Sequence, residues 1–123
     1  MFGPAGRLYV YLSYGIHACA NVVTGAEGEG AAVLIRAIEP IEGVAAMRAR
    51  RGEDRPLADG PGKLCQALGI LVSDDGIDLA ASGSSIQIVD DGTPPPDDPL
   101  IGQRIGISKA IDTPWRWRLA APT

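Results

Sequence analysis

The chain has 123 residues, of which 46% are hydrophobic, and it carries two cysteines and a formal net charge of −4. This length suits one domain with its own core, so we expect residues 1–123 to form a single domain. The acidic balance excludes a generally basic nucleic-acid-binding composition. The sequence lacks both a bilayer-spanning apolar run of about 20 residues and a signal-peptide pattern, so we expect a cytoplasmic protein.

A hairpin of two strands is predicted near the start of the chain. Residues 7–13 alternate in strand fashion, residues 16–23 form a second strand, and the tyrosine and glycine at 14–15 supply a tight reversal. Side chains alternate with a period of two, so the loop length decides their facing. Tyr11 and Asn21 lie on opposite faces if the loop has an even number of residues. They share a face if the loop has three residues or if one strand carries a bulge.

A third strand is predicted at residues 31–37 (AAVLIRA), which are apolar except for Arg36. A charge in such a strand is costly to bury unpaired, so Arg36 either reaches solvent or meets a carboxylate. The glycine-rich residues 24–30 between the second and third strands lack the Lys-Ser/Thr of a phosphate-binding loop. They are interpreted as a connector.

The next segment predicts a helix that Pro40 opens and Gly52 ends. Apolar residues recur every three positions along this helix and are expected to form its buried stripe. The members of that stripe are Ile41, Val44 and Met47. Three basic residues lie at the negative end of the helix, where they either suit the helix dipole or contact phosphate. These are Arg48, Arg50 and Arg51.

A second helix is predicted to begin at Pro61 and end before Gly69. Its apolar face is expected to consist of Leu64, Cys65 and Leu68. Gly62 and Lys63 lie in its first turn, where free backbone N–H groups favour an anion. Lys63 is therefore either a phosphate contact or an ordinary surface lysine.

The remainder predicts three short strands, at residues 85–89, 104–108 and 115–119. The order of strands and helices indicates an α+β fold on a mainly antiparallel, curved sheet, resembling an open barrel or roll. Cys19 and Cys65 lie in apolar runs without metal-ligand spacing, so we expect buried thiols rather than a disulfide.

The residues alone reveal no catalytic motif, because zinc spacing, a nucleophile elbow and a dinucleotide signature are all missing from the sequence. His17 is interpreted as structural, since it lies within a strand without a nearby nucleophile. The carboxylates that could act as a general base are expected to be solvated. They are Glu27, Glu29, Glu39 and Glu42.

Three runs of the sequence resemble one family in the order in which that family carries them. They are residues 1–21 (MFGPAGRLYVYLSYGIHACAN), 31–52 (AAVLIRAIEPIEGVAAMRARRG) and 60–70 (GPGKLCQALGI). The family is that of the alkyladenine (3-methyladenine or methylpurine) DNA glycosylases. The closing residues, which include DTPWRWRL, look like the family's final strands.

The resemblance implies hydrolysis of the N-glycosidic bond of alkylated or deaminated purines in duplex DNA, in base-excision repair. It implies no metal and no organic cofactor. We expect a monomer that acts on double-stranded DNA and does not associate with a membrane. Tyr14 matches the family's wedge, which fills the gap left by a flipped nucleotide. Tyr11 matches the aromatic that stacks on the flipped base. Asn21 matches the asparagine that excludes guanine by a clash with its amino group.

Two further matches complete the site that the resemblance implies. Arg36 matches the arginine beside the attacking water, and Lys63 with Gly62 matches a segment that contacts the DNA backbone. Because Tyr11 and Asn21 must line one pocket, the resemblance requires a three-residue loop or a bulge in the hairpin.

The sequence departs from the family because it resembles only the C-terminal three-fifths of such an enzyme. In the family, the glutamate that activates water precedes the segment that begins here at Met1. We therefore expect either a fragment or a protein whose remaining portion is separate. Glu27 and Glu29 are poor replacements, since an exposed loop does not fix a carboxylate in place. The alternative function is a non-catalytic module that binds damaged DNA with the same hairpin.

Overall fold

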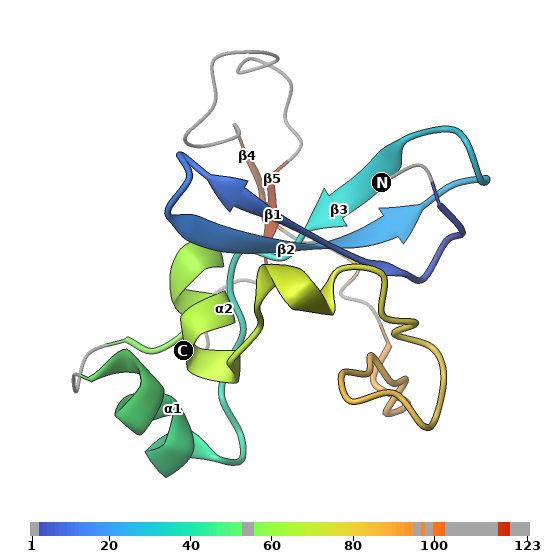
Figure 1. The fold of residues 1–123 in the computed structure, drawn as a ribbon. Coiled ribbons are helices and arrows are strands. Elements are labelled where there is room, and N and C mark those ends of the chain that lie inside the picture. Colours follow the sequence, from blue (N-terminus) through green and yellow to red (C-terminus); the bar gives the residue numbers. More distant parts are fainter. Residues whose placement is uncertain (1–2, 53–55, 95–96, 98–99, 103–115, 119–123) are drawn as a thin grey trace. The chain divides into compact units, whose positions relative to one another are not determined.

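The structure, a computed structural model, describes residues 3–52, 56–94, 97, 100–102 and 116–118 (Figure 1). The chain divides into two compact units, residues 1–89 and residues 90–123. Each unit is described by itself, and the single-domain organisation of the chain stays a prediction.

The first unit is built on a three-stranded antiparallel sheet in the order β1-β2-β3 (Figure 1). The strands are β1 (Leu8–Ser13), β2 (His17–Thr24) and β3 (Ala31–Leu34). Ser13 pairs with His17, so the loop between β1 and β2 has three residues. The prediction of a three-residue loop is confirmed. Consequently, odd-numbered residues of β1 and β2 share one face of the sheet.

The outer edge of β1 is covered by a segment that follows much later in the chain. The N–H of Leu8 donates to the carbonyl of Ile77 at 2.8 Å, and the N–H of Gly76 donates to the carbonyl of Leu8 at 2.7 Å. Farther along the edge, the N–H of Val10 donates to Oδ1 of Asp75 at 2.9 Å. These bonds satisfy backbone groups that an open strand edge would leave unpaired.

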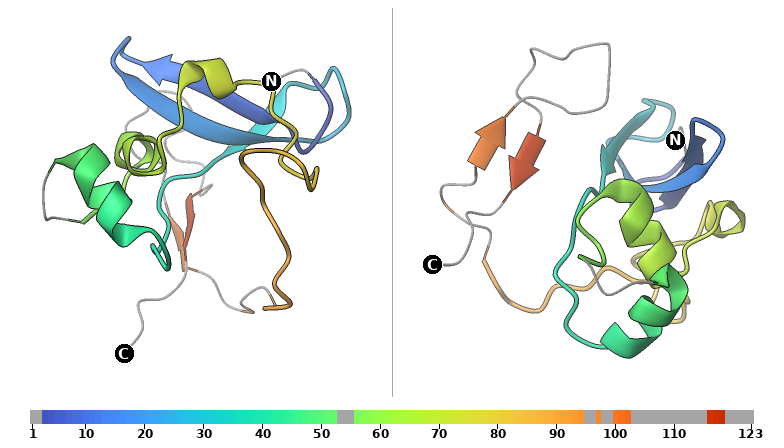
Figure 2. Two further views of the ribbon diagram at one scale, coloured as in Figure 1. Left: turned by 60° about the horizontal axis from the view of Figure 1, so that its bottom comes forward. Right: turned by 90° about the vertical axis from the view of Figure 1, so that its left-hand side faces the viewer.

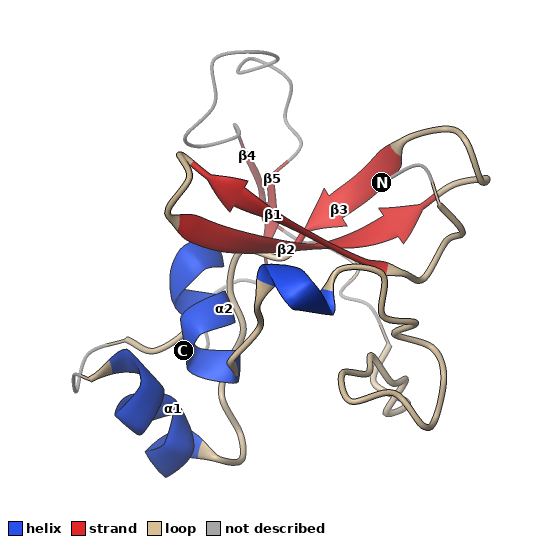
Figure 3. Cartoon of the chain, viewed as in Figure 1, coloured by secondary structure: helices blue, strands red, loops and turns tan. Residues whose placement is uncertain are grey.

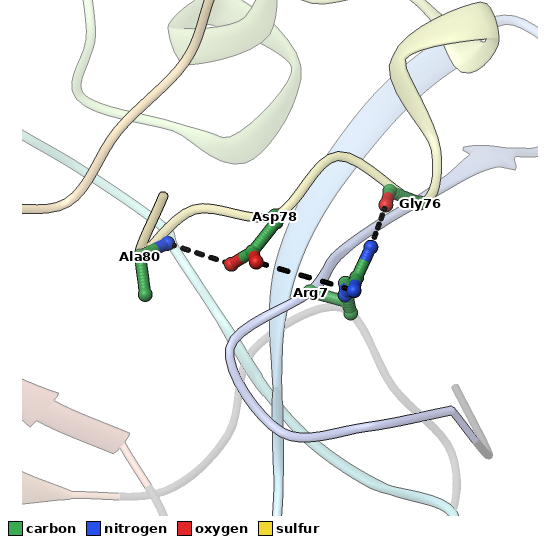
Figure 4. Close-up of polar contacts among 4 residues, drawn as sticks. All are labelled: Arg7, Gly76, Asp78 and Ala80. Atoms are coloured by element: carbon green, nitrogen blue, oxygen red, sulfur yellow. Dashed lines mark hydrogen bonds and ion pairs between the residues drawn. The ribbon is translucent and has the colours of Figure 1, made fainter. Parts of the chain in front are cut away.

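The guanidinium of Arg7 reaches the same covering segment (Figure 4). Its Nη1 donates to the carbonyl of Gly76 at 3.4 Å, and its Nη2 lies 3.9 Å from Oδ2 of Asp78. The other carboxylate oxygen of Asp78 accepts the backbone N–H of Ala80 at 3.0 Å. Both ends of this contact are exposed enough for water to weaken it.

Two helices lie on one side of the sheet, α2 against the sheet and α1 against α2 (Figures 2 and 3). They are α1 (Val44–Arg51) and α2 (Pro61–Leu68), and a short 3-10 helix, η1 (Val72–Asp74), follows. The main core lies between the sheet and α2. Its buried members are Leu8, Val10, Ala20, Ala58, Leu64, Cys65, Ile70 and Leu79.

The predicted start of the first helix was wrong. α1 begins at Val44 rather than at Pro40, because Gly43 adopts a left-handed conformation with φ of 73° and interrupts right-handed winding. Ile41 therefore lies before the helix with 87% of its surface exposed, and only Met47 of the expected stripe is fully buried. The end at Gly52 is confirmed, with φ of 71°.

The expected apolar face of α2 was wrong at one position. Leu64 and Cys65 are buried against the sheet, as predicted, but Leu68 is 38% exposed, and Ala67 is buried instead. Ala67 packs in a second cluster with Met47 and Leu57. Because α2 lies between the sheet and α1, it is buried on two sides, one facing the sheet and the other facing α1.

The second unit contains β4 (Leu100–Gly102) and β5 (Arg116–Arg118), which pair antiparallel. β5 lies within the predicted strand at residues 115–119, whereas the strand predicted at 104–108 falls outside the described residues.

The strand predicted at residues 85–89 was wrong, because this segment of the first unit forms no strand. The N–H of Ile88 donates to the carbonyl of Leu79 at 2.9 Å, and Val89 is 74% exposed.

The α+β fold class is confirmed by three antiparallel strands and two helices in the first unit. Within the described residues the sheet does not close on itself. None of the helices described is both long and apolar enough to cross a membrane.

Candidate functional site

The hairpin tip presents an aromatic side chain in an unusual backbone conformation. Tyr14 is 86% exposed and has a φ of 53°, and Gly15 follows with a φ of 69°. The N–H of Ile16 donates to the carbonyl of Ser13 at 3.1 Å and closes the turn. Positive φ at both central positions is typical of a type I′ turn, which favours Asn-Gly. A tyrosine in the left-handed region costs about 1 kcal/mol, so the tip is built against local preference.

Tyr9, Tyr11, Cys19 and Asn21 lie together on one face of the sheet, here named the tyrosine face. Tyr11 pairs with Cys19, and Tyr9 pairs with Asn21. The rings of Tyr9 and Tyr11 have centroids 5.5 Å apart and an interplanar angle of 35°. Tyr11 remains 37% exposed.

The side-chain amide of Asn21 is held in place on this face. Only 6% of Asn21 is exposed. Its Nδ2 donates to the carbonyl of Tyr9 at 3.2 Å and to the carbonyl of Cys19 at 3.3 Å. A buried amide with both N–H groups bonded has a fixed orientation, which a group that discriminates by a clash requires.

Arg36 follows β3 in a position that continues the register of the sheet. Asn21 pairs with Leu34, and the N–H of Ile35 donates to the carbonyl of Ala20 at 3.0 Å. Alternation beyond Leu34 thus brings Arg36 to the side of the sheet that carries Asn21. Arg36 is half-buried, and no ion pair joins it to a carboxylate within the described part of the chain. The register therefore assembles Tyr11 and Asn21 on one face, and continued alternation past β3 predicts Arg36 on the same side.

The residues expected at the DNA backbone fall at the first turn of α2. The side chain of His17 lies against Gly62, where an added Cβ would come within 3.2 Å of the His17 Cβ. Lys63 is exposed, and its Nζ lies 3.0 Å from Oδ1 of Asp59. This contact lowers the pKa of Asp59, chiefly through the hydrogen bond from Lys63.

Two of the three arginines of α1 contact the other end of α2. Nη1 of Arg50 donates to the carbonyl of Ala67 at 2.7 Å, and Nη1 of Arg51 donates to Oε1 of Gln66 at 2.8 Å. Arg48 lies in the same last turn. An eight-residue helix is about 12 Å long, and the arginine contacts and Lys63 belong to opposite ends of α2.

The remaining candidates for catalysis are exposed. His17, expected to be structural, lies at the exposed start of β2. The four glutamates expected to be solvated are exposed, as predicted. They are Glu27, Glu29, Glu39 and Glu42. In the part of the chain that is described, no three histidine, cysteine, aspartate or glutamate side chains gather to hold a metal ion.

Both cysteines are buried free thiols, as predicted. Burial raises the pKa of the Cys65 thiol, with a smaller contribution from the neighbouring Cys19. The hydrogen bond with the backbone of Ala20 acts in the opposite direction. A buried thiol with a raised pKa is inert, which agrees with a packing role for Cys65 in the core.

Sequence reasoning gave no functional role to Tyr9 or to Asp59. Tyr9 contacts Tyr11 through its ring and Asn21 through its carbonyl. The alternation of Tyr9 with Tyr11 was a sufficient signal to place both on one face. Asp59 lies four residues before Lys63, but the helix begins only at Pro61, so helical spacing gave no warning of the pair.

Comparison with known proteins gives a family match across almost the whole chain. The model of the family described as methylpurine-DNA glycosylase (MPG) matches residues 1–122. A relative from Burkholderia lata is 52% identical over 120 residues, which cover 95% of this chain and 58% of the relative. One from Rhodopseudomonas palustris is 55% identical over 121 residues, which cover 97% and 57%.

A third relative, from the archaeon Methanoculleus marisnigri, is 51% identical over 124 residues, which cover 97% of this chain and 64% of the relative. All three are provisionally named as 3-methyladenine DNA glycosylases. The chain thus spans about three-fifths of the length of these relatives. On the evidence of the family match and of these identities, the chain belongs to the methylpurine-DNA glycosylase family.

Proposed function

We propose that this chain is the damage-recognising part of a DNA glycosylase that removes alkylated or deaminated purines from duplex DNA in base-excision repair. The net reaction consumes one water, whose oxygen joins the sugar C1′. A proton from that water ends on a departing neutral base such as hypoxanthine, or in solvent when a cationic N-methylated purine departs as a neutral base. The observation that carries the proposal is the three-residue hairpin loop. It places Tyr11 and Asn21 on one face and leaves Tyr14 at the exposed tip.

Tyr14 acts as the wedge that enters the duplex when the damaged nucleotide leaves the stack. Unstacking costs a few kcal/mol, and less at a damaged pair. An aromatic ring that occupies the vacated space repays part of this cost. The 86% exposure of Tyr14 and the hydrogen-bonded turn that carries it support this role, because a wedge must project from the protein.

Tyr11 stacks on the flipped purine, and Asn21 rejects guanine. A planar base lies well against an exposed aromatic ring, and stacking contributes about 1–3 kcal/mol per base. The Asn21 amide is fixed by two carbonyls, so it cannot swing aside for the exocyclic amino group of guanine. Discrimination then comes from a clash rather than from additional contacts to the correct base.

Arg36 positions the attacking water, and a carboxylate must activate it. Within the described residues no ion pair supplies Arg36 with such a carboxylate, and the exposed glutamates offer no fixed alternative. We propose that residues 1–123 bind and flip the damaged base but hydrolyse the glycosidic bond very slowly unless a further segment of the family domain contributes the base. Neither a metal nor an organic cofactor takes part.

DNA contacts outside the base site come from Gly62 and Lys63 at one end of α2 and from the α1 arginines at the other. Water and phosphate compete for the Lys63 ammonium, since half of it is exposed beside Asp59. Arg50 and Arg51 already donate to α2, so they contribute to DNA binding less than Lys63 does. We propose a cytoplasmic monomer that binds double-stranded DNA.

Base release under single-turnover conditions tests the proposal. The substrates are duplexes that contain one ethenoadenine or one hypoxanthine, compared with undamaged DNA. We expect the 123-residue chain to bind the damaged duplex more tightly but to release little base. A polypeptide that also contains the N-terminal segment of the relatives should release it.

The outcomes separate the two candidate functions. Equal affinity for damaged and undamaged duplexes would rule out the glycosylase proposal and the alternative of a non-catalytic damage-binding module. Damage-specific binding without base release, even by the longer polypeptide, would favour the alternative.

A further inference from the structure

We propose that Tyr9 is a positioning residue that holds the ring of Tyr11 in the orientation that accepts a flipped purine. This inference rests on the proposed function, in which Tyr11 stacks on the flipped base. The rings of Tyr9 and Tyr11 are in direct contact on the tyrosine face.

The contact between the two rings is close enough to order the ring of Tyr11. Their centroids are 5.5 Å apart with a tilt of 35°, within the range of favourable aromatic pairs. Tyr9 is half-buried, and Tyr11 is 37% exposed. The ring of Tyr9 lies against the ring of Tyr11 and so limits its rotation. The Tyr11 side chain is thus partly ordered in the free protein, so it loses less conformational entropy when DNA binds.

Tyr9 also contacts the second selective group of the face, through a different atom. It lies directly across from Asn21 in the sheet, and its carbonyl accepts the Asn21 amide at 3.2 Å. A side-chain substitution at Tyr9 removes the ring but keeps this carbonyl. The consequence is a specific expectation: loss of the Tyr9 ring weakens stacking on Tyr11 and leaves the exclusion of guanine intact.

The experiment measures the affinity of the 123-residue chain for a duplex with one ethenoadenine and for the undamaged duplex. Tyr9→Leu should lower the ratio of the two affinities about 3- to 10-fold, the range expected for an aromatic pair. Tyr9→Phe keeps the ring and should stay within about twofold of the wild type. Ile41→Ala, which trims an exposed residue before α1, is the control and should change nothing.

A second readout follows the stacked base itself, through the fluorescence of ethenoadenine in the complex. Stacking on an ordered ring quenches it, so Tyr9→Leu should restore emission and Tyr9→Phe should not. A double-mutant cycle with Tyr11→Leu separates this effect from a general weakening of the strand. Without the Tyr11 ring, Tyr9→Leu should have no further effect on the affinity ratio.

Three results would overturn the inference. They are an unchanged affinity ratio in Tyr9→Leu, an equal loss on both duplexes, and additive effects in the double mutant. If Tyr9→Leu fails to fold, Tyr9→Val serves instead, since valine suits a strand. The absence of nuclear Overhauser contacts between the two rings in the wild type would also overturn it. Failure of the wild type to prefer the damaged duplex would count against the proposed function rather than against Tyr9.

Discussion

The ammonium of Lys63 lies 3.0 Å from the carboxylate of Asp59, at the first turn of the helix expected to approach the DNA backbone. A lysine that binds phosphate must exchange this carboxylate for the ligand. The pair is exposed, so it contributes little to stability and mainly sets the affinity of Lys63 for an anion.

Neutralising Asp59 should therefore strengthen DNA binding. Asp59→Asn removes the competing charge, and we expect a severalfold gain in affinity for any duplex at low salt. Lys63→Ala should weaken binding to damaged and undamaged DNA alike. It should also lower the slope of log affinity against log salt by about 0.9, the value for one phosphate contact. Fluorescence anisotropy over a salt series checks both, and unchanged slopes in Lys63→Ala would remove Lys63 from the interface.

Replacing Tyr14 by asparagine should stabilise the fold while weakening recognition. Asparagine tolerates the left-handed conformation, so we expect a gain of about 1 kcal/mol in the free energy of unfolding. Preference for a damaged duplex should fall because the wedge is lost. Tyr14→Ala is the matched control, since it removes the ring without relieving the backbone. Urea unfolding of both variants tests the idea, and an asparagine variant less stable than the alanine variant would contradict it.

The covering of the β1 edge should depend on Asp75 more than on Arg7. Asp75→Ala leaves the N–H of Val10 without its acceptor and should cost about 1–2 kcal/mol of unfolding free energy. Arg7→Ala removes an exposed pair 3.9 Å long and should cost less than about 0.5 kcal/mol. Chemical denaturation of the two variants gives the comparison. Equal losses would mean that the edge is held by charge rather than by the backbone.

Arg50 offers a test of the two interpretations of the α1 arginines. Its bond to the Ala67 carbonyl predicts that Arg50→Ala lowers the unfolding free energy by about 1 kcal/mol. The salt slope of DNA binding should remain close to that of the wild type. A reduced slope with unchanged stability would instead identify Arg50 as a phosphate contact.

The raised pKa of Cys65 predicts a loss of stability in alkaline solution. The folded protein keeps the thiol protonated, whereas the unfolded chain ionises above the ordinary thiol pKa of about 8.5. The stabilising contribution is thus complete below that pH and is lost as pH rises toward the folded-state pKa. Urea midpoints between pH 7 and 10 should fall more steeply for the wild type than for Cys65→Ala. Cys19→Ala should keep most of the dependence, because burial is the main cause.

Local sequence patterns predicted correctly where the two helices end. Gly52 and Gly69 end the two helices as expected, because each adopts the left-handed conformation that glycine favours. The register of the hairpin required more than alternation. Periodicity left the parity of the loop open, and only the need for Tyr11 and Asn21 to share a pocket favoured three residues.

Predictions failed both at a local backbone conformation and at long-range contacts. The left-handed conformation of Gly43 delays α1 beyond Pro40, although proline suits a first turn. Residues 85–89 alternate like a strand but meet, among the described residues, one backbone partner, at Leu79. Asp75 illustrates the same limit, since its bond to Val10 spans 65 residues. Rules based on composition or spacing use only residues close in sequence, so they cannot predict a hydrogen bond between residues so far apart in the chain.

The distant cover of β1 sets an order of events for a chain emerging from the ribosome. The hairpin joins residues close in sequence and can form early, whereas its outer edge waits for residues 75–79. At a synthesis rate of about 5–20 residues per second, that edge stays open for several seconds. During this interval a nascent hairpin with exposed tyrosines can pair with another chain, so synthesis speed through this stretch governs the yield of soluble protein.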